Sequence, residues 1–218
     1  MTYPAAIFDL DGTLADTLRD LADATNWGLA ELGQPTHPVQ AYRLMVGEGR
    51  NVLCQRALPS DRQDLTPRLE ELMTRYYGEH CFDFTAPYPG IEELLKALQA
   101  ANIRMAVLSN KPQPFVDLTI EKLFGAFRFD AVCGEGAGIA RKPDPAGALA
   151  IAEKLDLPPA TIAYVGDTWI DMETAVKAGM FAIGVTWGFR DRRELEDSGA
   201  QAIVDTPADL ARLLLGGR

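Results

Sequence analysis

The sequence predicts an α/β protein with a parallel sheet and a small all-helical insertion directly after the first strand. The apolar run at 5–8 is typical of a buried parallel strand, because it is rich in strand-forming residues and stops abruptly at two carboxylates. From about residue 91 onward, short apolar runs alternate with helical patterns. Such alternation predicts right-handed βαβ units and hence a parallel sheet.

The inserted segment, residues 15–82, is predicted to be helical, and we expect no strand within it. Apolar residues recur at helical spacing in 16–32, 39–45, 51–58 and 67–81. The pattern therefore predicts a small helical module that is inserted into the α/β part of the chain.

The remaining elements are predicted from alternating patterns and turn residues. Strands are expected at 103–108, 129–133, 162–165, 181–185 and 202–204. Helices are expected at 91–101, 115–123, 144–155, 170–178, 192–196 and 208–215. A turn is expected at 87–90, and the glycines at 134–138 are interpreted as a flexible linker.

Local signals set several helix ends. Gly33 and Pro35 follow the first helix in the order that terminates helices, and Gly179 closes a later one. Asp144 is expected to be the N-cap of the helix that has Pro145 in its first turn.

Composition excludes several classes of partner. The net charge of −10 over 218 residues argues against a nucleic-acid groove or an anionic membrane surface. No apolar run approaches the roughly 18 residues of a membrane helix. The three cysteines lack C-x-x-C spacing and are interpreted as reduced thiols of a cytoplasmic protein. A monomer and a homodimer are both compatible with the sequence.

Polar side chains follow four of the predicted strands. They are Asp9, Asp11, Ser109, Asn110, Lys142, Asp167 and Asp171. Parallel strands bring their carboxyl ends to one edge of a sheet, where α/β proteins bind ligands. Several carboxylates this close cannot all stay ionised without a cation, and an all-oxygen site suits Mg²⁺. Ser109 and Lys142 would then hold an anion. A phosphate ester placed between the metal and the lysine would give each of these charged and polar groups a partner.

The same residues carry a family resemblance. Asp9-Leu10-Asp11-Gly12-Thr13, Ser109-Asn110, Lys142 and Gly166-Asp167-x-x-x-Asp171 resemble the four motifs of the haloacid dehalogenase superfamily, in the family's order. The resemblance covers essentially the whole chain and implies a Rossmann-like core of residues 1–14 and 83–218, with residues 15–82 as a cap of the family's first type. Four stretches look most like phosphoglycolate phosphatases: 46–49, 75–77, 109–112 and 141–145.

The resemblance also implies a role for each matched residue. Asp9 would be the nucleophile that becomes an aspartyl phosphate, and Asp11 the acid that protonates the leaving alkoxide and later activates water. Asp9, the backbone carbonyl of Asp11 and Asp167 would hold Mg²⁺, with Asp171 assisting through water or by fixing Lys142. Ser109 and the catalytic Lys142 would bind the phosphoryl oxygens, and Thr13 and Asn110 would complete the substrate contacts.

Arg50 is the candidate for recognising the rest of the substrate. It follows Gly47 and Gly49 at the start of a short predicted helix, where it could pair with a substrate carboxylate. The alternatives are a surface arginine and neutralisation by the nearby Glu48. Arg190, Arg192 and Arg193 are interpreted as a solvated helix start.

These observations predict a Mg²⁺-dependent phosphatase for a small phosphorylated metabolite, with 2-phosphoglycolate as the leading substrate. A phosphosugar mutase of the same fold is the first alternative, and release of inorganic phosphate separates the two. A signalling receiver domain also combines an aspartate, a hydroxyl and a lysine on a parallel sheet. Receivers, however, lack an acid two residues beyond the nucleophile and lack the helical insertion.

Overall fold

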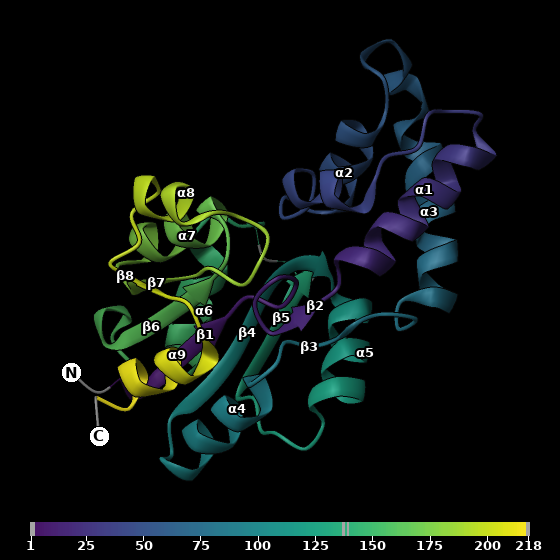
Figure 1. Ribbon diagram of the computed structural model, residues 1–218. Coiled ribbons are helices and arrows are strands. Elements are labelled where there is room, and N and C mark those ends of the chain that lie inside the picture. The colour runs from purple at the N-terminus through teal and green to yellow at the C-terminus, as the bar shows by residue number, and fades with distance from the viewer. Residues whose placement is uncertain (1–2, 137, 139, 217–218) are drawn as a thin grey trace.

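Parallel strands form the centre of the protein, which we describe from a computed structural model covering residues 3–136, 138 and 140–216. Among these residues one six-stranded sheet has the order β5-β4-β1-β6-β7-β8 (Figure 1), and every pair in it is parallel. The strands are β1 (Ala5–Phe8), β4 (Arg104–Pro112), β5 (Ala131–Glu135), β6 (Ile162–Gly166), β7 (Phe181–Val185) and β8 (Ala202–Val204). The predicted parallel α/β fold is confirmed.

Helices cover both faces of this sheet. They are α4 (Ile91–Ala100), α5 (Gln113–Phe124), α6 (Ala146–Lys154), α7 (Trp169–Ala178), α8 (Arg192–Asp197) and α9 (Pro207–Leu214), with a short 3₁₀ helix at Pro159–Thr161. Ala6 and Phe8 belong to the apolar cluster that includes residues of α4 and α9, whereas Ala5 and Ile7 belong to the cluster that includes residues of α6 and α7. Alternate side chains of a strand point to opposite faces, so β1 is buried on both.

A helical segment lies beyond the arrowheads of β4 and β5 (Figure 1). It comprises α1 (Leu18–Glu31), the 3₁₀ helix Val39–Leu44, α2 (Arg50–Ala57), the 3₁₀ helix Ser60–Leu65 and α3 (Thr66–His80). These helices share an apolar cluster of their own, to which the rest of the chain adds Phe189 and, at its margin, Phe115. No helix in the described residues is both long and apolar enough to cross a membrane.

Three local predictions are wrong. Ala15–Asp16 form β2, which pairs antiparallel with β3 (Ala86–Pro87), although no strand was expected at 15–82 and the turn expected at 87–90 is observed only at 89–90. The backbone of the chain entering the helical segment pairs here with the backbone of the chain leaving it. A strand of two residues is too short to show the apolar–polar alternation by which strands are predicted from sequence. The N-cap position before α6 is Pro145, while Asp144 accepts from the backbone N–H of Ala146 at 2.8 Å.

Strand β4 is longer than predicted. It continues through Ser109 and Asn110 to Pro112, so these residues lie on a strand rather than in a loop. Gly134, assigned above to a linker, lies within β5, and residue 137 of that predicted linker is outside the described residues.

Asp20 joins α1 to the chain that leaves the helical segment. This buried carboxylate in the first turn of α1 accepts hydrogen bonds from Phe84 N–H at 3.0 Å, from Thr85 N–H at 2.8 Å and from the Thr85 hydroxyl at 2.6 Å. Phe84 and Thr85 lead directly into β3, so one side chain fixes the entering helix against the leaving chain.

Replacing Asp20 with alanine should therefore destabilise the protein by about 2–4 kcal/mol, because buried donors lose a charged acceptor. Urea unfolding measures the loss. Asp23→Ala is the matched control, since Asp23 is on the same helix but pairs with Arg19 at the surface, where a pair contributes less than about 1 kcal/mol. Equal shifts of the two midpoints would contradict this account.

Candidate active site

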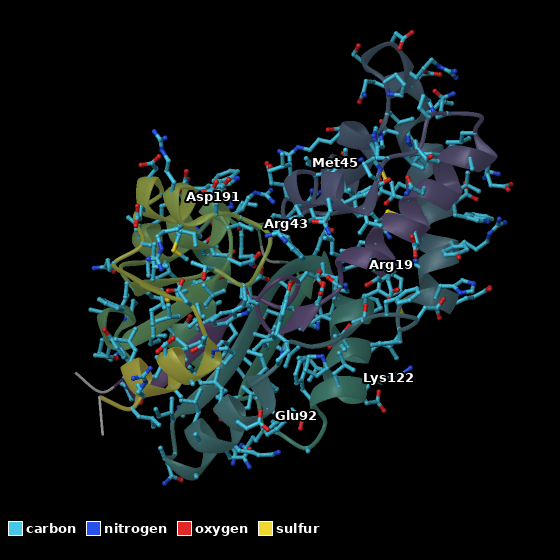
Figure 2. All side chains as sticks on the ribbon, viewed as in Figure 1. Arg19, Arg43, Met45, Glu92, Lys122 and Asp191 are labelled. Atoms are coloured by element: carbon cyan, nitrogen blue, oxygen red, sulfur yellow. The ribbon has the colours of Figure 1, made fainter. Side chains whose placement is uncertain are left out.

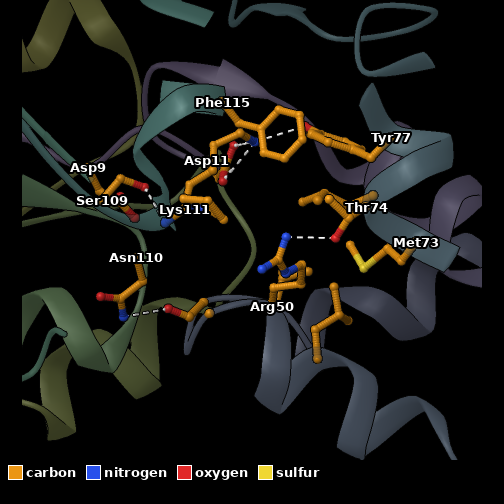
Figure 3. Close-up of a pocket in the computed structure, with 16 residues that line it drawn as sticks. Asp9, Asp11, Arg50, Met73, Thr74, Tyr77, Ser109, Asn110, Lys111 and Phe115 are labelled. Atoms are coloured by element: carbon orange, nitrogen blue, oxygen red, sulfur yellow. Dashed lines mark hydrogen bonds and ion pairs between the residues drawn. The ribbon is translucent and has the colours of Figure 1, made fainter. Parts of the chain in front are cut away.

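The sequence-predicted polar residues meet at the carboxyl edge of the sheet. Asp9 follows β1, which lies between β4 and β6, so it is flanked by the ends of both neighbours. Ser109 comes from β4, and Asp167 follows β6. Asp9, Asp11, Ser109 and Asn110 line one cavity (Figure 3), which the helical segment closes from the other side with residues of α1, α2 and α3.

Three buried carboxylates form a cluster at this edge. One oxygen from each of Asp9, Asp167 and Asp171 lies within 4.8 Å of the others. The ammonium of Lys142 lies 2.9 Å from Asp9 Oδ1 and 2.7 Å from Asp171 Oδ1. Asp171 Oδ2 accepts from the backbone and hydroxyl of Thr168, which caps α7. Asp171 thus holds Lys142 in place with one oxygen and its own helix with the other.

Burial and mutual repulsion raise the pKa of two of these carboxyls. The pKa of Asp9 rises to about 7, chiefly through desolvation and partly through Asp171, although Lys142 opposes the shift. Desolvation, with repulsion from Asp171 and Asp9, holds the pKa of Asp167 well above its usual range. Among the described residues, Asp167 accepts only from neutral donors, the Thr13 hydroxyl at 2.9 Å and the Phe189 N–H at 2.8 Å.

The donor set fits a hard divalent cation. The cluster offers carboxylate oxygens, and Lys142 contacts Asp9 and Asp171 but makes no ion pair with Asp167 among the described residues. A divalent ion would neutralise the remaining charge, and oxygen ligands are what Mg²⁺ and Ca²⁺ take.

Glycines allow other backbone segments to approach Asp167 closely. Gly12 has φ +90°, and a Cβ atom there would lie 2.4 Å from Asp167 Oδ2. At Gly188 a Cβ atom would lie 2.3 Å from the Asp167 Cβ. The turn after β1 and the loop after β7 therefore both pack on this carboxylate, and Trp187 links them by donating to the Thr13 carbonyl at 3.0 Å.

Two residues that are predicted to contact the substrate have protein partners. The Thr13 hydroxyl is buried and directed at Asp167. The Asn110 amide donates to the carbonyls of Gly47 and Lys142, both at 3.0 Å, and accepts from the Lys142 N–H at 2.8 Å. Asn110 thereby fixes the backbone at Lys142 and also contacts the helical segment at Gly47. A substrate contact by either residue stays a prediction.

Asp11 has a partner that sequence reasoning missed. The buried ammonium of Lys111 lies 2.9 and 3.2 Å from the two oxygens of Asp11, and 2.8 Å from the hydroxyl of Tyr77 on α3. In the sequence analysis Lys111 belonged to the stretch 109–112, and no role was predicted for it. The predicted strand ended at residue 108, so strand periodicity did not extend to Lys111, and no local pattern in the sequence indicated this pair.

Arg50 lines the same cavity but is already paired. Its Nε lies 3.0 Å from Glu70, and its Nη1 donates to the Thr74 hydroxyl at 2.6 Å. Glu48, the expected competitor, pairs with Arg56 instead. Recognition of a substrate carboxylate by Arg50 stays a prediction.

A pair of arginines joins the helical segment to the loop after β7. Arg43 donates to the carbonyls of Gly188 and Phe189, and Figure 2 shows it between the two parts of the molecule. Arg190 donates in return to the Val46 carbonyl at 3.0 Å. Its side chain is only 5% exposed, so the prediction of a solvated arginine is wrong at this position. The pairing is long-range and leaves no local pattern in the sequence.

Comparison with known proteins decides the family. Residues 6–185 match the family described as haloacid dehalogenase-like hydrolase. The chain belongs to this family. It is 35% identical to a phosphoglycolate phosphatase of Pseudomonas syringae pv. tomato, over 96% of this chain and 78% of the relative. It is 32% identical to one of Nitrosospira multiformis, over 96% and 95%.

Solved structures agree with this chain in fold. A candidate phosphoglycolate phosphatase of Lactobacillus delbrueckii subsp. bulgaricus superposes with a TM-score of 0.93 at 35% identity, covering 99% of this chain and 100% of that one. CbbY of Rhodobacter sphaeroides, solved with phosphate, gives 0.75 at 26% identity, covering 96% of each. With the relatives named above, this makes the chain a phosphoric monoester hydrolase.

The contact of Gly12 with Asp167 gives a test of the site. Gly12→Ala should reduce phosphatase activity by more than about 100-fold, because the new methyl group displaces the carboxylate by far more than the site tolerates. Gly33→Ala is the matched control: Gly33 also has positive φ, but nothing lies within 4 Å of a Cβ atom there. It should lose about 1–2 kcal/mol of stability and keep its activity. Comparable activity in the two variants would refute the role given to this contact.

Proposed function

We propose that this enzyme is a Mg²⁺-dependent phosphatase that hydrolyses 2-phosphoglycolate, or a closely similar small ester, through an aspartyl phosphate on Asp9. One observation carries the proposal: Asp9 belongs both to the buried acidic cluster and to the lining of the cavity. A phosphoryl group in the cavity would therefore meet a carboxylate that is held beside a candidate metal site.

The residues of this chain divide the reaction between them. An oxygen of Asp9 attacks phosphorus while the ester P–O bond breaks, and the leaving oxygen takes a proton from Asp11. Water then gives a proton to Asp11 and attacks the aspartyl phosphate, which releases phosphate and restores Asp9. Lys142 and Ser109 donate to the phosphoryl oxygens, where negative charge is spread in the transition state.

Asp9, Asp167, Asp171 and the backbone carbonyl of Asp11 are the proposed holders of Mg²⁺. When bound, the ion supplies positive charge that lets an anionic carboxylate approach an anionic ester. The raised pKa values of Asp9 and Asp167 support this assignment, since they reflect first the burial of the two carboxyls and then repulsion within the acidic cluster, and a bound cation opposes both effects.

The substrate assignment rests on the relatives and on the cavity. Relatives at 32–35% identity are named phosphoglycolate phosphatases. Apolar residues of the helical segment, among them Leu21, Val46, Leu53 and Met73, enclose the cavity. Such a lining leaves room for a compact organic group and excludes water around the reacting ester. A small phosphorylated acid fits this description better than a nucleic acid or a phosphoprotein.

Phosphate release from a panel of small phosphoesters tests the proposal. With Mg²⁺ the enzyme should release phosphate from 2-phosphoglycolate faster than from the other esters, and chelation should stop turnover. Ca²⁺ should restore little activity, because its larger and more flexible coordination shell misplaces nucleophile and phosphate. Full activity in excess chelator would contradict the proposed dependence on Mg²⁺. Conversion of a sugar phosphate to its isomer without phosphate release would favour the mutase.

A further inference from the structure

The cavity holds two cations that could select the organic part of the substrate. Among the described residues that line it, these are Arg50 on α2 and Lys111 on β4. Figure 3 shows Lys111 beside Asp11 and Ser109, whereas Arg50 lies across the cavity next to Thr74. They therefore stand at different distances from the place where the ester bond breaks.

Lys111 is held at the reacting end of the cavity. Its ammonium contacts Asp11, the proposed donor to the leaving oxygen, at 2.9 Å. In 2-phosphoglycolate a single methylene carbon separates the ester oxygen from the carboxylate. A carboxylate on so short a leaving group lies close to whichever group protonates the ester oxygen. Lys111 is within reach of that position because it already touches Asp11.

Lys111 and Tyr77 together present two hydrogen-bond donors. An ammonium carries three protons, and the Lys111 ammonium contacts three acceptors: Asp11 Oδ1 at 2.9 Å, Asp11 Oδ2 at 3.2 Å and the Tyr77 hydroxyl at 2.8 Å. A ligand carboxylate would take the proton of the longest contact, while Asp11 keeps the contact through Oδ1. Tyr77 accepts from Lys111, and its own hydroxyl proton has no acceptor within the described parts of the chain. Burial raises the pKa of Tyr77 to about 12, so the phenol keeps this proton. Both side chains line the cavity.

Arg50 is less suited to a short leaving group. Glu70 neutralises its charge at 3.0 Å, and Glu70 is held in turn by Asn51 at 3.0 Å. Lys111 is also ion-paired, so position rather than charge separates the two cations: Arg50 lies across the cavity from Asp11, next to Thr74 (Figure 3). The pair of Arg50 and Glu70 therefore serves to join α2 to α3 from the side of the cavity away from Asp11.

We propose that Lys111 and Tyr77 form the subsite that binds the carboxylate of a phosphorylated 2-hydroxy acid and so determine substrate specificity. This inference rests on the proposed function. Tyr77 comes from α3 and Lys111 from the sheet, so the subsite is complete only where the helical segment meets the sheet. Binding of the carboxylate thus depends on the contact that encloses the ester.

The test compares 2-phosphoglycolate with ethyl phosphate, which has a leaving group of similar size and no carboxylate. The measured quantity is the ratio of the two kcat/KM values, because any effect that Lys111 exerts through Asp11 is common to both esters. Lys111→Met should lower the ratio about 10- to 100-fold, as expected for loss of a hydrogen bond to a charged group. Tyr77→Phe, which removes one oxygen atom, should lower it in the same direction by a smaller factor.

Arg50→Met is the control for charge at the far side of the cavity, and its ratio should stay close to that of the wild type. A ratio that collapses in Arg50→Met and is unchanged in Tyr77→Phe would overturn the inference and assign the carboxylate to Arg50. Should Lys111→Met fail to fold, Tyr77→Phe decides alone. A wild-type enzyme that hydrolyses neither ester refutes the proposed function as well, whereas activity with an unchanged ratio in both subsite variants refutes only the inference.

Discussion

The ion-pair group around Lys142 is the interaction on which the rest of the structure depends. Buried carboxylates from the end of β1 and from the first turn of α7 converge here, and one ammonium contacts both Asp9 and Asp171. Unpaired charge at this depth would cost several kcal/mol for each ion. The surrounding structure therefore serves to hold Lys142 in place: Asn110 fixes its backbone, and Asp171 accepts from it while capping α7.

The same constraint explains why the loops around the sheet edge are glycine-rich. Asp167 has no ion-pair partner among the described residues and is stabilised by close neutral donors, which requires backbone without a Cβ atom at Gly12 and Gly188. The loop that carries Gly188 also inserts Phe189 into the apolar cluster of the helical segment. The acidic cluster and the helical segment that lines the cavity are thus packed on one loop.

Much of this arrangement could be predicted because the decisive signals are local. Apolar runs of different period separate the strands from the helices, and the carboxylates at 9, 11, 167 and 171 follow strands whose parallel pairing brings them together. The rest depends on long-range contacts. Nothing near Lys111 in the sequence indicates Tyr77, and nothing near Arg190 indicates the Val46 carbonyl. Pairings of this kind are fixed only when the helical segment is seated on the sheet.

The central claim is that buried charge at the sheet edge prepares Asp9 to accept a phosphoryl group. Rapid acid quenching during turnover of 2-phosphoglycolate with Mg²⁺, followed by peptide mass spectrometry, tests it most directly. The account predicts one phosphoryl group on Asp9 in the wild type, and neither that group nor turnover in a folded Asp9→Asn variant. Phosphate release by Asp9→Asn at the wild-type rate, or a phosphoryl group on another residue, would contradict it.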